Sequence, residues 1–82
     1  MIALKVLYFA QAGEAAGCRA EHWEIHSPLT LDEFWHEAVV RHPGLNLLRD
    51  QCRVASGMTY LLAGERIEPQ QETAVIPPVS GG

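Results

Sequence analysis

Alternating apolar and polar positions predict two strands in the first third of the chain. Residues 2–9 are apolar on one face and nearly so on the other, which predicts a central strand covered on both sides. Residues 22–26 alternate again, with Trp23 and Ile25 on one face, and predict a half-buried strand. The small residues between them, 11–17, predict a short helical turn between glycines that stop it.

An amphipathic helix is predicted in the middle of the chain. Thr30, followed three residues later by Glu33, has the form of a capping box, so we expect the helix to start at Leu31. Apolar residues then recur at the spacing of one helix face: Leu31, Phe34, Trp35, Ala38 and Val39. Pro43-Gly44 ends the helix. A helix with a single apolar stripe is not stable alone, so we expect this stripe to pack on the apolar face of the predicted sheet.

The second half of the chain predicts a hairpin and a last strand. The apolar residues within 45–48 are compatible with another helical turn. Residues 54–62 predict a tight hairpin that turns at Ser56-Gly57, where the glycine supplies the positive φ. After a polar, turn-like segment at 70–72, residues 73–76 predict a short final strand.

This order of elements predicts a two-layer α+β domain in which one sheet packs on one main helix. The chain has 82 residues, which suffice for a single hydrophobic core. Its content of 48% hydrophobic and 20% charged residues excludes a disordered chain. So short a chain has little surface for a deep catalytic cavity, which favours a carrier, a binding module or a subunit. We expect a folded domain at residues 1–76 and a flexible tail at 77–82.

The charge distribution excludes nucleic-acid binding and favours a protein partner. Ten acidic residues against six basic ones give a net charge of −4, and Lys5 is the only lysine. A nucleic-acid interface needs clustered basic residues, whereas an acidic surface favours a basic partner. No apolar stretch has the roughly 18 residues that a membrane helix requires. The apolar N-terminal segment is too short for a secretion signal, so we expect the cytoplasm.

The histidines do not predict a metal site. His22 and His26 are four residues apart, which places them about 13 Å apart on an extended strand. His36 and His42 have no third ligand at a recognisable spacing. No metal ligand is therefore assigned.

The cysteines and carboxylates do not predict a catalytic centre either. Cys18 and Cys52 are too few and too isolated for a disulfide framework or a zinc pair, and we expect them to be reduced. Cys18 lies four residues before His22, but this spacing is not specific to a nucleophilic dyad. The acidic residues form no distinctive acid and base pair, since Glu33 has a capping role and Glu37 an i, i+4 partner in Arg41.

The end of the sequence is its most informative segment. Glycine has no side chain, so an extended Gly81-Gly82 could pass through a channel too narrow for other residues and present a terminal carboxylate to a buried site. Pro77-Pro78 would stiffen the base of such an arm by fixing φ. A carboxylate is unreactive until activated, so we expect another enzyme to convert it with ATP to an acyl adenylate. The alternative is a frayed glycine tail without a role.

Two segments resemble the molybdopterin synthase small subunit, the MoaD group of the ubiquitin-like sulfur carriers. The ending Pro77-Pro78-Val79-Ser80-Gly81-Gly82 after Ala74-Val75-Ile76 is similar to the end of that family. The opening Val6-Leu7-Tyr8-Phe9-Ala10-Gln11 is similar to its first strand and the turn after it. The resemblance implies a β-grasp, ubiquitin-like fold with a mixed sheet packed on one main helix.

The resemblance also implies an activity. Gly82 would be adenylated by a ubiquitin-activating-like enzyme that uses ATP, and a persulfide donor would convert it to a thiocarboxylate. The residues before it, Pro77, Pro78, Val79, Ser80 and Gly81, would enter the large subunit of molybdopterin synthase, where sulfur passes to cyclic pyranopterin monophosphate. Tyr8, Phe9 and Ile76 would contact that subunit in a heterotetramer. This chain would bind no cofactor stably and would not be a catalyst alone.

Three other functions fit the same tail. A sulfur carrier of thiazole formation in the thiamin pathway also ends in two glycines, usually on a shorter chain without the double proline. A ubiquitin-like modifier would be joined through Gly82 to lysines of target proteins. A carrier for another sulfur-containing metabolite would share the thiocarboxylate and differ only in its partner.

Overall fold

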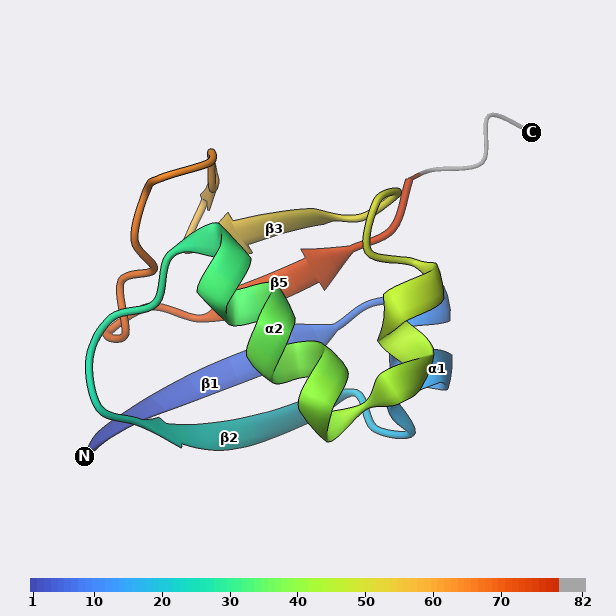
Figure 1. The fold of residues 1–82 in the computed structure, drawn as a ribbon, viewed down its shortest axis with the longest axis horizontal. Helices are drawn as coiled ribbons and strands as arrows, with labels where there is room; N and C mark the ends of the chain where they lie inside the picture. The colour runs from blue at the N-terminus through green and yellow to red at the C-terminus, as the bar shows by residue number, and fades with distance from the viewer. Residues whose placement is uncertain (79–82) are drawn as a thin grey trace.

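The computed structural model describes residues 1–78, in which one main helix crosses a five-stranded sheet (Figure 1). The helix α2 lies across one face of the sheet, and the short helix α1 lies at the end of the sheet where β1 and β5 terminate. The elements in chain order are β1 (Ile2–Tyr8), α1 (Gln11–Ala16), β2 (Ala20–Ile25), α2 (Leu31–Arg41), the 3₁₀ helix η1 (Pro43–Leu47), β3 (Arg53–Ser56), β4 (Thr59–Tyr60) and β5 (Thr73–Ile76).

The sheet is mixed, because the first and last strands run parallel at its centre. Its strand order is β2-β1-β5-β3-β4. The strand β1 pairs with β2 in the antiparallel sense and with β5 in the parallel sense, Val6 lying opposite Thr73. The strand β3 is antiparallel to both of its neighbours. This topology confirms the β-grasp fold.

The burial of β1 differs from the prediction that both of its faces are covered. Leu4, Val6 and Tyr8 are buried, Leu7 is half-buried, and Ala3 and Lys5 are exposed. The central position of the strand is as predicted. The prediction of two covered faces was wrong because α2 packs on only one face of the sheet. Apolar residues on the other face of a strand can remain exposed to solvent.

Two turns depend on glycines with positive φ. The helix α1 ends at Gly17, whose φ of 77° is the left-handed C-cap that the sequence predicted. Gly57 has a φ of 65°, but the two-residue turn is Gly57-Met58, one residue later than predicted, and Ser56 belongs to β3. A Cβ on Gly57 would meet the end of the Gln71 side chain, which is exposed and can move aside, so the positive φ is what favours glycine there.

The capping box of α2 forms as predicted. The Glu33 amide donates to Oγ1 of Thr30 at 3.3 Å, and the Thr30 amide donates to Oε1 of Glu33 at 2.9 Å. The helix ends at Arg41, and Pro43 begins η1, which confirms the further helical turn. Within residues 1–78, every helix is too short or too polar to cross a membrane.

Aromatic stacking joins α2 to the sheet. Phe34 is fully buried, and its ring stacks on Trp23 of β2 with 5.0 Å between ring centroids. Trp35 meets the edge of the same Phe34 ring at 5.7 Å. The predicted apolar stripe therefore faces the sheet, as expected, with Leu31 and Val39 half-buried at its margins.

Truncating Phe34 should destabilise the fold strongly. We expect Phe34→Ala to lower the free energy of unfolding by roughly 3 to 5 kcal/mol, because it leaves a cavity beneath Trp23. Val40→Ala on the same helix is the control, since Val40 is 64% exposed and should change stability by about 0.5 kcal/mol or less. Urea unfolding of both variants checks this, and a similar loss for the two would contradict the packing described.

Thr73 offers a stabilising substitution. Its side chain is fully buried in β5, and within residues 1–78 its Oγ1 has no hydrogen-bond partner. A buried hydroxyl without a partner is destabilising, so we expect Thr73→Val, which keeps the shape, to raise the free energy of unfolding by about 1 kcal/mol. Thermal unfolding measures the change. A clear loss of stability would show that the hydroxyl is hydrogen-bonded in solution.

Candidate functional site

The base of the tail is fixed at the centre of the sheet. β5 ends at Ile76, after which Pro77 is buried and Pro78 is exposed. The Phe9 amide donates to the Val75 carbonyl at 3.1 Å, which extends the contact between β1 and β5 to their ends. In Figure 1 the chain leaves β5 on the side of the molecule where α1 lies. The predicted site residues Val79, Ser80, Gly81 and Gly82 lie outside the described residues.

The three side chains predicted to contact a partner differ in exposure. Phe9, directly after β1, is 48% exposed, and Ile76 is half-buried beside the tail base. Tyr8 is only 2% exposed, because its side chain points to the helix-covered face of the sheet. Tyr8 is therefore part of the core and has almost no surface for a partner, which corrects that prediction. Phe9 and Ile76 stay predictions.

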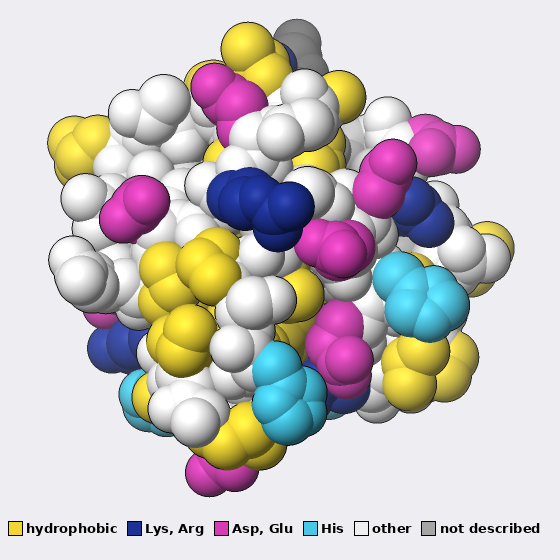
Figure 2. Space-filling model, turned by 60° about the vertical axis from the view of Figure 1, so that its left-hand side comes forward, with side chains coloured by type: hydrophobic (Ala, Val, Ile, Leu, Met, Phe, Trp, Pro, Cys, Tyr) yellow, Lys and Arg dark blue, Asp and Glu magenta, His cyan; other side chains and the backbone are white. Residues whose placement is uncertain are grey.

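The surface seen in Figure 2 carries basic and acidic side chains side by side. The Lys and Arg side chains on this face lie apart from one another. Within residues 1–78, basic side chains pair with carboxylates, such as Lys5 with Glu72 at 3.1 Å. This face therefore has no clustered basic surface of the kind that binds phosphates.

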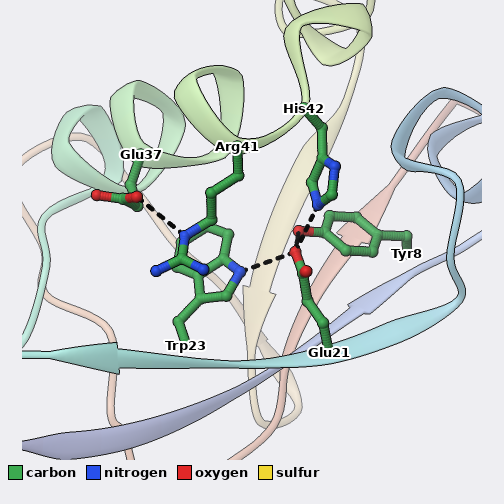
Figure 3. Close-up of polar contacts among 6 residues, drawn as sticks. All are labelled: Tyr8, Glu21, Trp23, Glu37, Arg41 and His42. Carbon is green, nitrogen blue, oxygen red and sulfur yellow. Dashed lines mark hydrogen bonds and ion pairs between the residues drawn. The ribbon is translucent and has the colours of Figure 1, made fainter.

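The carboxylate of Glu21 contacts three other side chains and joins the end of α2 to the sheet (Figure 3). Oε2 of Glu21 accepts hydrogen bonds from the Tyr8 hydroxyl, from Nε1 of Trp23 at 2.8 Å and from Nε2 of His42 at 2.7 Å. An ionised carboxylate can only accept, so the His42 tautomer must carry a proton on Nε2. We call these four residues the Glu21 cluster.

The electrostatics of the Glu21 cluster favour the charged carboxylate. Burial by itself would raise the pKa of Glu21, but hydrogen bonds from Trp23, Tyr8 and His42 outweigh it and leave that pKa below its ordinary value. Burial and the same hydrogen bond to Glu21 raise the pKa of Tyr8 far above its ordinary range. Glu21 thus remains ionised and Tyr8 remains a donor at neutral pH.

Cys18 lies beside the Glu21 cluster and completes a group of three different ligand atoms. Its Sγ, a carboxylate oxygen of Glu21 and a ring nitrogen of His42 all lie within 4.8 Å of one another. Cys18 and Cys52 are both free, as predicted. The sequence prediction concerned spacing along the chain, in which His42 has no third ligand; the fold brings Cys18 and Glu21 close to it.

The sequence contained part of the signal for this group. The predicted strand began at His22, whereas β2 begins at Ala20. Starting two residues earlier places Glu21 on the same face as Trp23 and Ile25, so a carboxylate facing the core could have been identified. His42 lies 21 residues from Glu21, and no local spacing relates it to Cys18. His22, His26 and His36 are exposed and outside the group, so the Cys18–His22 pairing does not form.

Cys18 also lines the pocket at the end of the sheet. An open pocket of about 710 Å³ lies where β1 ends and β2 begins. Phe9, Gly13, Cys18 and Arg19 are among its lining residues.

Comparisons with known proteins identify the family. The model of the ThiS family matches residues 6–82. The molybdopterin synthase sulfur carrier subunit of Homo sapiens is 38% identical, covering 96% of this chain and 93% of that protein. The subunit of the same name from Caenorhabditis briggsae is 32% identical over the full length of both. The crystal structure of SAMP1 from Haloferax volcanii superposes with a TM-score of 0.81 at 26% identity, covering 98% of this chain and 99% of that one.

The structural match covers the fold, and the sequence matches include the residues after β5. The chain therefore belongs to the ThiS family, and within it to the group of the molybdopterin synthase sulfur carrier subunits.

Proposed function

We propose that this chain is the sulfur-carrying small subunit of molybdopterin synthase and that Gly82 carries the sulfur. The observation that carries this proposal is the full-length similarity to subunits of that name. The ending Pro77-Pro78-Val79-Ser80-Gly81-Gly82, which follows the central strand β5, supports it. The reactive atom is carried on the tail, so the chain is a sulfur donor within an enzyme and not a catalyst by itself.

The proposed chemistry begins with activation of the Gly82 carboxylate. A ubiquitin-activating-like enzyme, which binds the ATP, forms the acyl adenylate and releases pyrophosphate. The terminal sulfur of a persulfide donor then attacks the acyl carbon and expels AMP, and a second thiol reduces the resulting acyl disulfide to the thiocarboxylate. A thiocarboxylate is a stronger nucleophile than a carboxylate, so it can deliver sulfur to cyclic pyranopterin monophosphate. Hydrolysis of the acyl–sulfur bond then leaves the sulfur on the pterin and restores the Gly82 carboxylate for the next cycle.

The proposed partner is the large subunit of the synthase, in a cytoplasmic heterotetramer. The tail beyond Pro77, residues 78–82, would enter that subunit, and Phe9 and Ile76 would contact it beside the tail base. Pro77 is buried in this chain and stays at the base, which corrects the prediction that it enters the partner. The buried Pro77 supports this arrangement because it anchors the tail to the central strand, which limits the conformational entropy lost on docking. This chain binds no cofactor stably in the proposed cycle.

The first experiment is an intact-mass measurement of the chain with a native, untagged C-terminus. We expect incubation with ATP, an adenylating enzyme of this family and a persulfide source to replace one oxygen by sulfur. Deletion of Gly82 should abolish the shift, because the acyl group that is activated is then missing. If the mass does not change while the same enzyme activates a known carrier, the proposal is wrong.

Two further assays separate the alternative functions. Covalent conjugates to lysines of other proteins would identify a protein modifier joined through Gly82. A thiocarboxylate that supports thiazole formation, but not dithiolene formation on the pyranopterin, would identify a thiamin-pathway carrier.

Gly81→Ala tests whether the tail enters a narrow channel. We expect the variant to fold normally but to form and deliver the thiocarboxylate slower by about tenfold or more, because an added methyl group misplaces the reacting carbon. Ser80→Ala is the matched control, since it adds no bulk to the tail. Single-turnover sulfur transfer measures both variants, and an unchanged rate for Gly81→Ala would exclude a steric limit at this position.

A further inference from the structure

We propose that Cys18, Glu21 and His42 form a Zn²⁺ site that clamps the end of α2 to β2. The three residues offer a sulfur, an oxygen and a nitrogen ligand within 4.8 Å of one another. Zinc is commonly bound by this mixture of thiolate, carboxylate and imidazole ligands. The site is separate from the tail, and the inference does not rest on the proposed sulfur chemistry.

The distances fit a metal after a small adjustment. Zinc bonds of about 2.0 to 2.3 Å in tetrahedral geometry place ligand atoms roughly 3.5 Å apart. Nε2 of His42 and Oε2 of Glu21 are 2.7 Å apart, so an ion entering between them would widen this pair by about 1 Å and replace the proton that they share. The Cys18 side chain would move by a similar amount toward the ion.

The carboxylate of Glu21 is already oriented by hydrogen bonds from the core. Tyr8 and Trp23 both donate to Glu21, and both are buried in the core. Hydrogen bonds of this kind orient a metal-binding carboxylate and reduce the side-chain entropy that is lost when the metal binds. His42 and Glu21 keep 19% and 22% of their side-chain surfaces exposed, so an ion can reach them from solvent.

The charges of the three ligands balance the ion. Glu21 is ionised, because its hydrogen bonds lower its pKa. The thiolate is the form of cysteine that binds zinc, so the Cys18 thiol must release its proton when the metal binds. Two anionic ligands and a neutral imidazole then offset the two positive charges of Zn²⁺.

Three protein ligands leave one coordination position free. Cys18 lines the pocket of about 710 Å³ at the end of the sheet, so the fourth position can hold a water molecule from this pocket. Bound zinc would join the residue after α2 to β2 and to the turn before it, reinforcing the contact that His42 already makes with Glu21.

Cobalt spectroscopy of the reduced, untagged full-length chain tests the proposal. We expect Co²⁺ to bind at one equivalent, with a thiolate-to-cobalt charge-transfer band in the near ultraviolet and the visible absorption of tetrahedral cobalt. Zn²⁺ added afterwards should displace it. Cys18→Ala should abolish the charge-transfer band, and His42→Gln should weaken binding by tenfold or more.

Cys52→Ala is the matched control, because Cys52 is the other free, half-buried cysteine and lies outside the three-residue group. It should bind cobalt as the native chain does. Zn²⁺ should also raise the melting temperature of the native chain and of Cys52→Ala, but not of Cys18→Ala. Circular dichroism without metal establishes that each variant is folded. No saturable binding, or binding that survives in both Cys18→Ala and His42→Gln, would overturn the proposal.

Discussion

The parallel pairing of β1 with β5 is the constraint on which the rest of this structure depends. It joins the first and last strands of the described chain, so every other element must fit between or around them. The helix α2 covers the pair on one face, and β2 and β3 flank it. A parallel pair cannot be closed by a tight turn, and the intervening residues therefore form the helix and the hairpin before the chain returns. The direction in which the chain leaves Ile76 is a consequence of this pairing.

The attachment of α2 to the sheet has two parts with different chemistry. The stack of Phe34 on Trp23 is apolar and lies in the middle of the helix. At the C-terminal end of α2, His42 reaches the carboxylate of Glu21, which also accepts hydrogen bonds from β1 and β2. The stack stabilises the contact by burying apolar surface, an effect that has no preferred direction. The hydrogen bonds, by contrast, require one relative orientation of the helix end and the sheet. Together they orient the helix on the sheet.

The two proposed sites make different demands on the fold. The sulfur-carrying tail needs a rigid point of departure, which the buried Pro77 at the end of the central strand supplies. The proposed zinc site needs three side chains from separate segments at fixed distances. A small domain can meet both demands because neither requires a deep cavity.

Local interactions were readable from the sequence. The capping box of α2 and the positive φ of the turn glycines depend on residues only a few positions apart, so short patterns suffice to predict them, although the hairpin turn lies one residue later than predicted. The ending in two prolines and two glycines pointed to the family in the same way. The two-layer α+β class followed from the order of these elements and from the single apolar stripe of the helix.

The tertiary structure alone decided which surfaces meet. The apolar pattern of β1 could not show that only one face is covered, and Tyr8 could be placed in the core only when α2 and β2 were in position. The group of Cys18, Glu21 and His42 joins residues up to 24 positions apart, by the difference of their numbers, and no spacing rule spans that separation. By itself the sequence determined most of the elements, because these are encoded locally, and its ending led to the chemistry proposed for the tail. The convergence of the three ligands was decided by packing the helix end against the second strand, which is a property of the folded chain as a whole.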